Sequence, residues 1–569
     1  MHMQHVYSVL SFDLCSHGGV EMVIEKKYLL IDDSNTAISI MRSMLNVAGI
    51  SNHNIDSTMD SLKAIRLLAA HSYDIVICDY NMRHHIDGGL IFDEVKQRRL
   101  LPSDGVFMCV TGDSTQKVVT HLIELEPDDY LIKPFSAAAF INRIEMVLAR
   151  KSTLYPLLLA VDNKDYQTAT DLCKRYRADH PLYTGYIDRI NGDCLLRSER
   201  HLEAKIFYEN ACKHSDHLWP RIGFGQALKG LGELKRAEAV FQDILAKYPK
   251  QPLARKHLAG CLMASGRVPE ALEQFHLLHK VNSANPLREL IIANLYAVLQ
   301  QHQKAAIGYL SFIQKVTGTS RYSFGVYSNI SVSLMLASIY TDDNSEYTEL
   351  LNEARHNIYE QNIHGDTEKE RYESEIGSLV GVAILACLHG EIQDSFTIVS
   401  KINLQEKPID DYYTVLNIAR LYGFCGMPEQ YEKTMQIARG LCGKSDDDVL
   451  IQSQVKLLEA CHAEINQRLK EGGELVEKAF EKRKSNNAIG ALEDAYRAFH
   501  MVPFHYQLCF LILELTALAT PSFLKTANIK GVISSCNWVC CNDTRPKKEE
   551  IERANELYKL ALERVNKLL

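Results

Sequence analysis

The first part of the chain alternates between short apolar runs and longer segments whose apolar residues recur at helical spacing. Continuous apolar runs predict buried strands of a parallel sheet, and the segments between them predict helices that cover both of its faces. The predicted strands are Tyr28–Ile31, Asp74–Cys78, Val106–Val110 and Tyr130–Ile132. The predicted helices are Thr36–Val47, Ser61–Ala70, Leu90–Arg98, Gln116–Leu125 and Ala137–Arg150. Together these elements predict an α/β domain over residues 26–150.

From residue 151 onward the strand patterns vanish, and amphipathic helices repeat with a period of 34 residues. The positions that recur in phase are an aromatic residue at Phe241, Phe275 and Tyr309, an alanine at Ala237, Ala271 and Ala305, and a small residue at Gly225, Ala259 and Ala293. Earlier units carry the same pattern at Gly192, Ala204 and Tyr208, and at Ala169 with Pro181, which matches Pro249. A small residue on one helix lets the next helix approach closely, and proline ends that second helix. The pattern predicts stacked helical pairs over residues 151–320.

Beyond residue 320 the repeats become irregular. Gly390–Ile392 and Gly426–Pro428 predict turns between helices, and Ala491, Ala495 and Ala498 again fit the second helix of a pair. We therefore expect degenerate helical repeats over residues 321–569. The last segment, Glu549–Leu569, predicts an amphipathic helix that caps the stack, with a coiled-coil or partner-binding helix as the alternative.

Composition and charge narrow the class of protein. The chain has 569 residues, of which 46% are hydrophobic and 24% charged, as in ordinary globular proteins. A net charge of −8 argues against a protein that coats nucleic acid. No apolar stretch is long enough to span a membrane, and no signal peptide precedes the first predicted strand. Residues 1–25 are expected to be a leader that is either untranslated or disordered, with Met22 as a candidate start.

The 15 cysteines are mostly scattered singly within apolar patterns. This distribution favours buried free thiols in a reducing compartment, so we expect a cytoplasmic protein. One cluster, Cys536, Cys540 and Cys541, lacks a pair at metal-binding spacing and a nearby histidine. It is therefore interpreted as packing thiols in a loop and not as a zinc site.

Polar residues follow each predicted strand of the first domain. Asp32 and Asp33, Asp79, Thr111 and Lys133 all fall where the carboxyl ends of parallel strands converge. Carboxylates so close together repel one another unless a divalent cation joins them, and Mg²⁺ accepts carboxylate and carbonyl oxygens. The expected ligands are Asp32, Asp33, Asp79 and the backbone carbonyl of Asn81. Lys133 and Thr111 could then hold the oxygens of a phosphoryl group on Asp79, because a carboxylate is a competent nucleophile.

This ordered set closely resembles the receiver domain of bacterial two-component response regulators. The matching motifs are Leu30–Ser34, Asp79–Met82, Thr111–Asp113 and Tyr130–Phe135. The resemblance implies a doubly wound, five-stranded parallel sheet of the flavodoxin-like type, and phosphorylation of Asp79 by a sensor or hybrid histidine kinase.

The resemblance also assigns roles to the neighbouring residues. Lys133 pairs with the phosphoryl group, Thr111 and Tyr130 form the switch, and Lys133-Pro134 corresponds to a cis peptide. Asn81 and Asp113 occupy positions that influence dephosphorylation, which implies a phosphorylated lifetime well short of many hours. The sequence departs from the family at Arg83, where proline is usual, and in a longer loop that reaches Gly89.

The repeats resemble the tetratricopeptide repeat, whose stacked helices bind proteins or peptides on a concave face. No nucleic-acid-binding, cyclase, phosphodiesterase or His-Asp metal-hydrolase signature follows the first domain, and an unrecognised enzyme in residues 320–569 is the least favoured hypothesis. The combined expectation is a non-enzymatic response regulator in which phosphorylation of Asp79 gates protein–protein binding by the repeats. The alternative is a phosphate sink, or an inhibitor or scaffold that acts on the kinase of a parallel regulator. The oligomeric state is not determined by the sequence.

Overall fold

The computed structural model describes most of the chain and divides it into two compact units. The described residues are 23–82, 86–113, 118, 122, 124–214, 216–281, 285–341, 343–361, 367–389, 391–402, 404, 407–442, 447–518, 529–542 and 547–567. The first unit comprises Met1–Ser265, Gln274–Asn285 and Lys315–Arg321. The second comprises Gly266–Glu273, Pro286–Gln314 and Tyr322–Leu569. The domain boundaries expected from the sequence stay a prediction.

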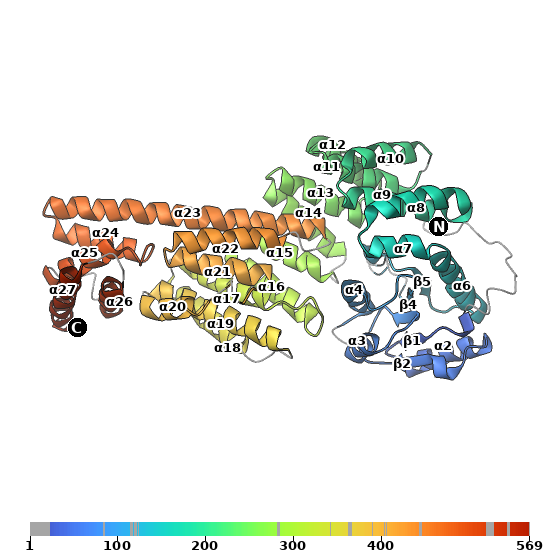
Figure 1. Cartoon of the computed structure of the whole chain (residues 1–569), viewed down its shortest axis with the longest axis horizontal. Coiled ribbons are helices and arrows are strands. Elements are labelled where there is room, and N and C mark those ends of the chain that lie inside the picture. Colours follow the sequence, from blue (N-terminus) through green and yellow to red (C-terminus); the bar gives the residue numbers. More distant parts are fainter. Residues whose placement is uncertain are drawn as a thin grey trace. The chain divides into compact units, whose positions relative to one another are not determined.

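The first unit begins with a five-stranded parallel sheet in the order β2-β1-β3-β4-β5 (Figure 1). Its strands are β1 (Tyr28–Ile31), β2 (Ile55–Thr58), β3 (Ile75–Asp79), β4 (Val106–Thr111) and β5 (Asp129–Ile132). This is the doubly wound order expected for the flavodoxin-like fold. The hydrophobic pattern alone missed β2, because this edge strand has the sequence Ile-Asp-Ser-Thr and buries only its two ends.

Helices cover both faces of the sheet. They are α2 (Asn35–Val47), α3 (Ser61–Ala70), α4 (Gly88–Arg98) and α6 (Ala137–Thr153). Each begins after a residue whose side chain accepts a backbone N–H of the first turn, and these caps are Ser34, Asp60, Asp87 and Ser136. Most of the predicted helix Gln116–Leu125 lies outside the described residues, as does the loop with Arg83, His84 and His85.

Two apolar cores lie on opposite faces of this sheet. One joins the sheet to α3 and α4, through residues such as Ile65 and Ile91. The other joins it to α2 and α6, through residues such as Leu45 and Ile144. Val23, which the sequence analysis assigned to the leader, is buried in the second core, and its carbonyl accepts the hydroxyl of Tyr28 at 3.0 Å.

Helical pairs follow the sheet domain within the first unit. They are α7 (Tyr155–Asp162), α8 (Tyr166–Asp179), α9 (Thr184–Arg197), α10 (His201–His214), α11 (Leu218–Gly230), α12 (Leu234–Lys247) and α13 (Pro252–Ala264). A Cβ added to Gly225 of α11 would lie 2.5 Å from the Phe241 ring of α12. A Cβ added to Gly192 of α9 would lie 2.4 Å from the Tyr208 hydroxyl of α10. These glycines therefore do what the repeat pattern predicts, which is to let an aromatic ring of the next helix pack against the backbone.

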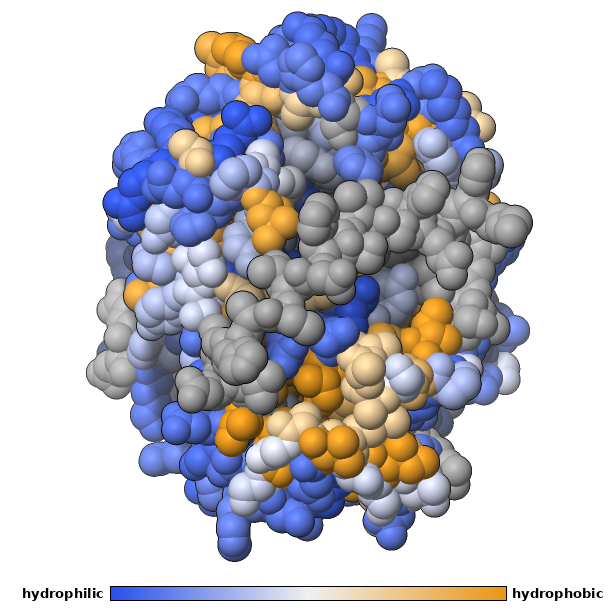
Figure 2. All heavy atoms as spheres, turned by 90° about the vertical axis from the view of Figure 1, so that its right-hand side faces the viewer, coloured by the Kyte–Doolittle hydropathy of each residue, from blue (hydrophilic) through white to orange (hydrophobic). Residues whose placement is uncertain are grey.

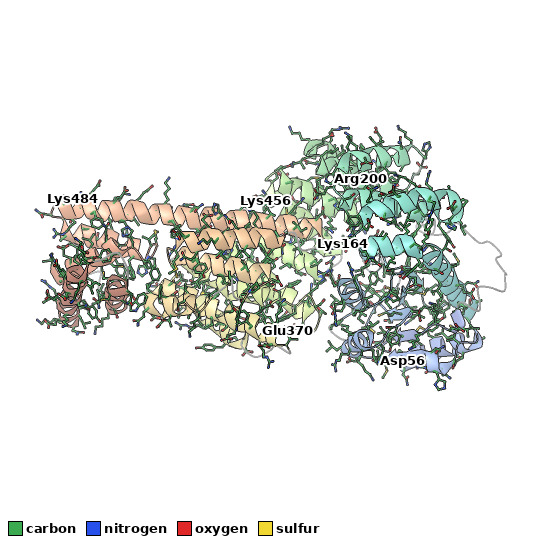
Figure 3. The ribbon with its side chains drawn as sticks, in the orientation of Figure 1. Asp56, Lys164, Arg200, Glu370, Lys456 and Lys484 are labelled. Carbon is green, nitrogen blue, oxygen red and sulfur yellow. The ribbon has the colours of Figure 1, made fainter. Side chains whose placement is uncertain are left out.

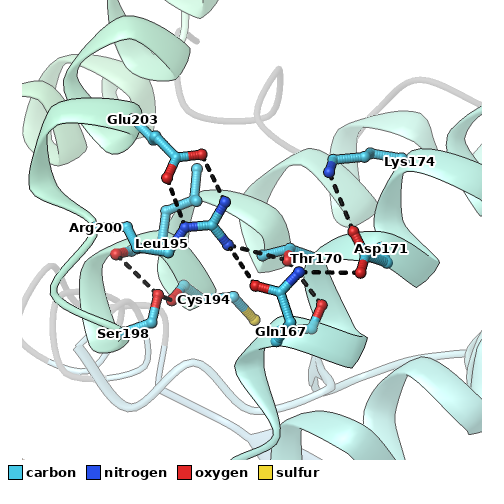
Figure 4. Close-up of polar contacts among 9 residues, drawn as sticks. All are labelled: Gln167, Thr170, Asp171, Lys174, Cys194, Leu195, Ser198, Arg200 and Glu203. Carbon is cyan, nitrogen blue, oxygen red and sulfur yellow. Dashed lines mark hydrogen bonds and ion pairs between the residues drawn. The ribbon is translucent and has the colours of Figure 1, made fainter.

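A polar cluster ties α8 to the start of α10 (Figure 4). The guanidinium of Arg200 binds both carboxylate oxygens of Glu203 and donates to the Oε1 of Gln167 at 3.3 Å. Gln167 in turn donates to Asp171, one helical turn further along α8. Because these groups are largely exposed, we expect them to orient the helices more than to stabilise them.

The second unit consists entirely of helices in its described residues (Figure 1). They include α15 (Pro286–Val298), α17 (Phe324–Ile339), α18 (Asn344–Gln361), α19 (Glu368–His389), α20 (Ile392–Val399), α21 (Tyr412–Phe424), α22 (Pro428–Leu441), α23 (Asp448–Lys484), α24 (Ala488–Phe499), α25 (Tyr506–Leu518), α26 (Ile529–Asn542) and α27 (Lys548–Asn566). Two further helices, α14 (Val268–Val281) and α16 (His302–Val316), contribute residues to both units. The unusual member is α23, whose 37 residues continue well past the length of a repeat helix.

The turn glycines, the alanine pattern and the cysteine cluster predicted from the sequence all belong to the second unit. Gly426 lies in the turn between α21 and α22 with a φ of 71°, whereas Gly390 falls outside the described residues. Ala491, Ala495 and Ala498 form the fully buried stripe of α24. The three clustered cysteines lie on α26 and not in a loop, because the sequence around them has the apolar spacing of a helix that packs between α25 and α27. The capping role of α27 stays a prediction.

Charged side chains lie on the outer surfaces of the helices, as Figure 3 shows for Arg200, Lys456 and Lys484. Apolar surface gathers in the lower part of Figure 2, over the region where Figure 1 places α2 and α6. Exposed apolar residues on these two helices are Ile40, Val47 and Met146. Within the described part of the chain, no helix is long and apolar enough to cross a membrane.

Candidate functional site

The sheet brings together the polar residues that the sequence analysis placed at its strand ends. Asp32 and Asp33 follow β1, Asp79 ends β3, Thr111 ends β4, and Lys133 follows β5. The helix that follows β1, α2, packs on one face of the sheet, and the helix that follows β3, α4, packs on the other. The carboxyl ends of these two adjacent strands therefore border the crevice where such folds bind ligands. Asp32, Asp79 and Thr111 are 1%, 5% and 0% exposed, so the site lies at the base of this edge.

Lys133 is the centre of the site. Its Nζ lies 2.7 Å from Oδ2 of Asp32 and 2.6 Å from Oδ1 of Asp79, so one ammonium group bridges two carboxylates. Partial burial lowers the pKa of Lys133, but its hydrogen bonds to the two carboxylates outweigh that effect and raise the pKa overall. Lys133 therefore stays positively charged and offsets two negative charges at the strand ends.

Both carboxylate oxygens of Asp79 have partners. Oδ1 accepts from Lys133, and Oδ2 accepts the backbone N–H of Asn81 at 2.9 Å. Burial, together with the nearby Asp32 carboxylate, raises the pKa of Asp79 overall, although Lys133 and the Asn81 N–H lower it. A carboxylate that is poorly hydrated yet held in one orientation is suited to nucleophilic attack on an electrophile at the mouth of the site.

The predicted switch residues Thr111 and Tyr130 lie on β4 and β5. The Thr111 hydroxyl accepts the backbone N–H of Asp113 at 3.0 Å, and the Thr111 carbonyl accepts the N–H of Lys133 at 2.8 Å. Tyr130 is partly buried and packs against the core under α3 and α4. The peptide bond between Lys133 and Pro134 is cis, as the resemblance implied.

The donor set of the site fits a magnesium ion in its chemistry. Asp32, Asp33 and Asp79 offer hard oxygen ligands, together with the backbone carbonyl of Asn81. In the described residues, however, no three acidic, histidine or cysteine side chains are grouped so that they could hold a metal ion. Lys133 instead lies between Asp32 and Asp79. A cation at this edge would thus share these carboxylates with Lys133.

The sequence assigned no role to two residues that shape the site, Ser34 and Gly88. Ser34 donates its backbone N–H to Oδ1 of Asp32 at 2.9 Å and thereby orients that carboxylate. Gly88, the first residue of α4, packs so tightly that an added Cβ would lie 2.3 Å from the Asp79 carbonyl oxygen. The glycine pair Gly88-Gly89 after the longer loop was the available signal, since glycine often marks a close backbone approach.

Comparison with known proteins finds similarity to known families in two stretches of the chain. A model of the response regulator receiver domain matches residues 28–145, and a tetratricopeptide repeat model matches residues 228–287. A probable transcriptional regulator ycf27 from Cyanidium caldarium is 30% identical over 135 residues, which is 24% of this chain and 51% of the relative. Its counterpart from Galdieria sulphuraria is 28% identical over 131 residues, covering 23% of this chain and 48% of that protein. The chain thus spans about half the length of the curated relatives it matches.

Solved structures match the same region. A CheY-like receiver domain from Methanospirillum hungatei JF-1 is 14% identical, with a TM-score of 0.21, and covers 22% of this chain and 97% of its own. A receiver domain protein from Clostridium thermocellum is 24% identical, with a TM-score of 0.20, and covers 23% of this chain and 98% of its own.

Proposed function

Because this chain combines a response regulator receiver domain with tetratricopeptide repeats, we propose that it accepts a phosphoryl group on Asp79 and uses it to gate protein binding by its helical repeats. The observation that carries the proposal is the bridging position of Lys133 between Asp32 and Asp79. Such a cation can bind an oxygen of a phosphoryl group as the group joins the neighbouring carboxylate.

The proposed reaction is a transfer from a phosphohistidine of a sensor or hybrid kinase. An oxygen of Asp79 attacks phosphorus, the P–N bond to the imidazole breaks, and the imidazole leaves with a proton from solvent. Asp32, Asp33 and the carbonyl of Asn81 would hold Mg²⁺, which when bound neutralises charge on the phosphoryl oxygens. Lys133 binds one of these oxygens, and Thr111 reorients its hydroxyl toward another, while Tyr130 moves into the space vacated.

The test is phosphorylation of the purified full-length chain by a small acyl phosphate with magnesium. We expect intact-mass analysis to find one phosphoryl group on the wild type and none on Asp79→Asn. Asp60→Asn is the matched control, because asparagine caps a helix as well as aspartate does and Asp60 caps α3 outside the site. Labelling of Asp79→Asn at the wild-type level would refute Asp79 as the acceptor.

The second half of the proposal concerns the repeats. We expect the set of proteins captured by the wild type to change on phosphorylation, and the set captured by Asp79→Asn to stay the same with and without the donor. An unchanged set for the phosphorylated wild type would exclude gating. It would leave the alternative, in which the chain drains phosphoryl groups from a kinase or holds that kinase. Adding the chain to a kinase and a second regulator then tests the alternative directly, because transfer to the second regulator would fall.

A further inference from the structure

One short segment of the first unit lies far from the receiver domain in sequence but is bound to its surface. Residues Lys315–Arg321 comprise the end of α16 and most of the turn that leads to α17, and we refer to them as the clasp. The guanidinium of Arg321 binds both carboxylate oxygens of Asp93 on α4, with its Nη2 2.6 Å from Oδ1. The backbone N–H and the hydroxyl of Ser320 both donate to Oε2 of Glu94, at 2.8 Å each. Two successive residues of the clasp thus bind two successive carboxylates of α4.

The carboxylates of α4 are suited to this contact because they are well shielded from water. Glu94 is 2% exposed, and its other oxygen accepts from Arg98 at 3.2 Å. The Asp93 and Arg321 side chains are 23% and 16% exposed. A carboxylate so buried is costly without partners, so the clasp contributes donors that α4 requires.

An apolar contact completes the interface. Gly318 has a φ of +84°, and an added Cβ would lie 2.8 Å from a methyl group of Leu62 on α3 and 3.8 Å from one of Ile86. Only glycine combines this backbone conformation with this spacing. The clasp also holds its own shape, because Thr319 bonds back to the Val316 carbonyl through its N–H and its hydroxyl. A preformed segment loses little entropy when it binds.

The bound surface adjoins the candidate phosphorylation site. Gly88, at the start of α4, lies against the Asp79 carbonyl and donates its N–H to the Tyr80 carbonyl at 3.0 Å. Ile86, whose side chain lies near Gly318 of the clasp, accepts the Ser61 hydroxyl of α3 through its carbonyl at 2.7 Å. A shift of the backbone at Asp79 must therefore displace the start of α4, and with it the helix that carries Asp93 and Glu94.

We propose that the clasp is the intramolecular partner of the α3–α4 surface and that it transmits the phosphorylation state of Asp79 to the helical repeats. The proposal rests on the proposed function. The chain continues from Arg321 through Tyr322 into Ser323, which caps α17 in the second unit. In that unit the Ser323 hydroxyl donates to Asp411, the cap of α21, at 2.6 Å. Binding or release of the clasp thus changes the tether at the start of two helices of the repeats.

The test measures amide hydrogen exchange in peptides that cover the clasp, in the full-length chain with and without acyl phosphate and magnesium. Intact mass reports phosphorylation of the same samples. We expect phosphorylation to change exchange of the clasp about fivefold or more, as coupling between sites usually does. In Arg321→Ala, exchange should be fast in both states while Asp79 is still labelled, and partner capture should no longer depend on phosphorylation.

Two further variants distinguish loss of the contact between Arg321 and Asp93 from a general loss of stability. Arg267→Ala is the matched control, because Arg267, just before α14, forms an exposed ion pair with Glu270 of that helix, and it should behave as the wild type does. The exchanged pair Asp93→Arg with Arg321→Asp should restore part of the coupling that Arg321→Ala loses, which a general loss of stability would not.

The outcomes separate this inference from the proposed function. If Asp79 is labelled and partner capture responds while exchange of the clasp stays constant, the clasp is refuted and the proposed function stands. If Arg321→Ala leaves exchange of the clasp at the wild-type level, the contact itself is refuted. If Asp79 is never labelled, the proposed function fails and the clasp fails with it as a transmitter.

Discussion

At the scale of single residues, burial decides which polar groups can carry charge. Two carboxylates stabilise the positive charge of Lys133 and raise its pKa. A buried group that lacks such partners instead favours its neutral form. His302 of the second unit is an example, because neither ring nitrogen has a hydrogen-bond partner among the described residues and the ring stacks on Tyr340 at 5.7 Å. Burial, and then the nearby Arg420, lower its pKa to about 4.

This histidine predicts acid sensitivity of the fold. Because the pKa in the folded state lies below the ordinary value of 6.5, the unfolded chain binds a proton first as pH falls. The stabilising contribution is complete above about pH 6.5 and is lost as pH falls toward 4, which amounts to about 2 kcal/mol at pH 5. Urea unfolding of His302→Phe at pH 7 and pH 5 should show a pH dependence smaller by that amount. His53→Gln, at an exposed position of the first domain, is the control for the loss of a histidine as such.

At the scale of elements, close approach between helices depends on a few small residues. Gly225 of α11 lies so near to the Phe241 ring of α12 that a methyl group has no room there. The repeat pattern predicted this pairing, since a small residue and an aromatic recurred in phase. Tight packing of this kind makes the helical pair intolerant of even one added carbon.

We therefore expect Gly225→Ala to destabilise the chain. Overpacking costs about 1–3 kcal/mol, of which the better helix propensity of alanine returns up to about 1 kcal/mol. Gly185→Ala is the matched control, because Gly185 of α9 has nothing within 4 Å of an added Cβ and is exposed. Thermal unfolding should show a lower midpoint for Gly225→Ala only, and an unchanged or raised midpoint for Gly185→Ala. Equal midpoints for the two variants would contradict the close approach.

At the scale of the whole molecule, contacts between distant segments hold the helices of the second unit together. Asn294 of α15 donates to the hydroxyls of Tyr413 on α21 and Ser453 on α23, and accepts the Tyr309 hydroxyl of α16, all at 3.0 Å. These partners lie up to 159 residues away in sequence. The long helix α23 thus covers α15 and α21 from within the same unit, and a partner for those faces would have to displace it.

Removing the Asn294 amide should destabilise the packing of α15 against α21 and α23. Asn294→Ala removes one hydrogen bond from each of three buried hydroxyls, at about 1 kcal/mol for each bond, although the Ser453 hydroxyl still donates to the Leu450 carbonyl. We expect a loss of about 3 kcal/mol in urea unfolding, together with faster hydrogen exchange in α15 and α23. Asn357→Ala, which removes an amide that donates to the Glu353 carbonyl within its own helix α18, should change neither quantity. A wild-type exchange pattern in Asn294→Ala would show that packing alone holds α23.

The sequence by itself determined the two-part architecture and the candidate site. Strand and helix periods are local properties of the sequence. The acidic residues, Thr111 and Lys133 stand at the carboxyl ends of strands, and in a parallel sheet these ends lie at one edge. The 34-residue period likewise predicted which small and aromatic residues pair. The polar edge strand β2 was missed by the pattern, because few of its side chains are buried.

Only the tertiary structure decided the contacts between segments far apart in the chain. Nothing in the local pattern pairs Arg321 with Asp93 or Asn294 with Ser453, because charge and amide groups on helices usually face water. Their partners are set by how whole helices pack, and a buried polar group then needs a partner wherever the fold supplies one. The residues of the candidate site could therefore be predicted from local patterns, whereas these contacts between distant segments depend on how the helices pack.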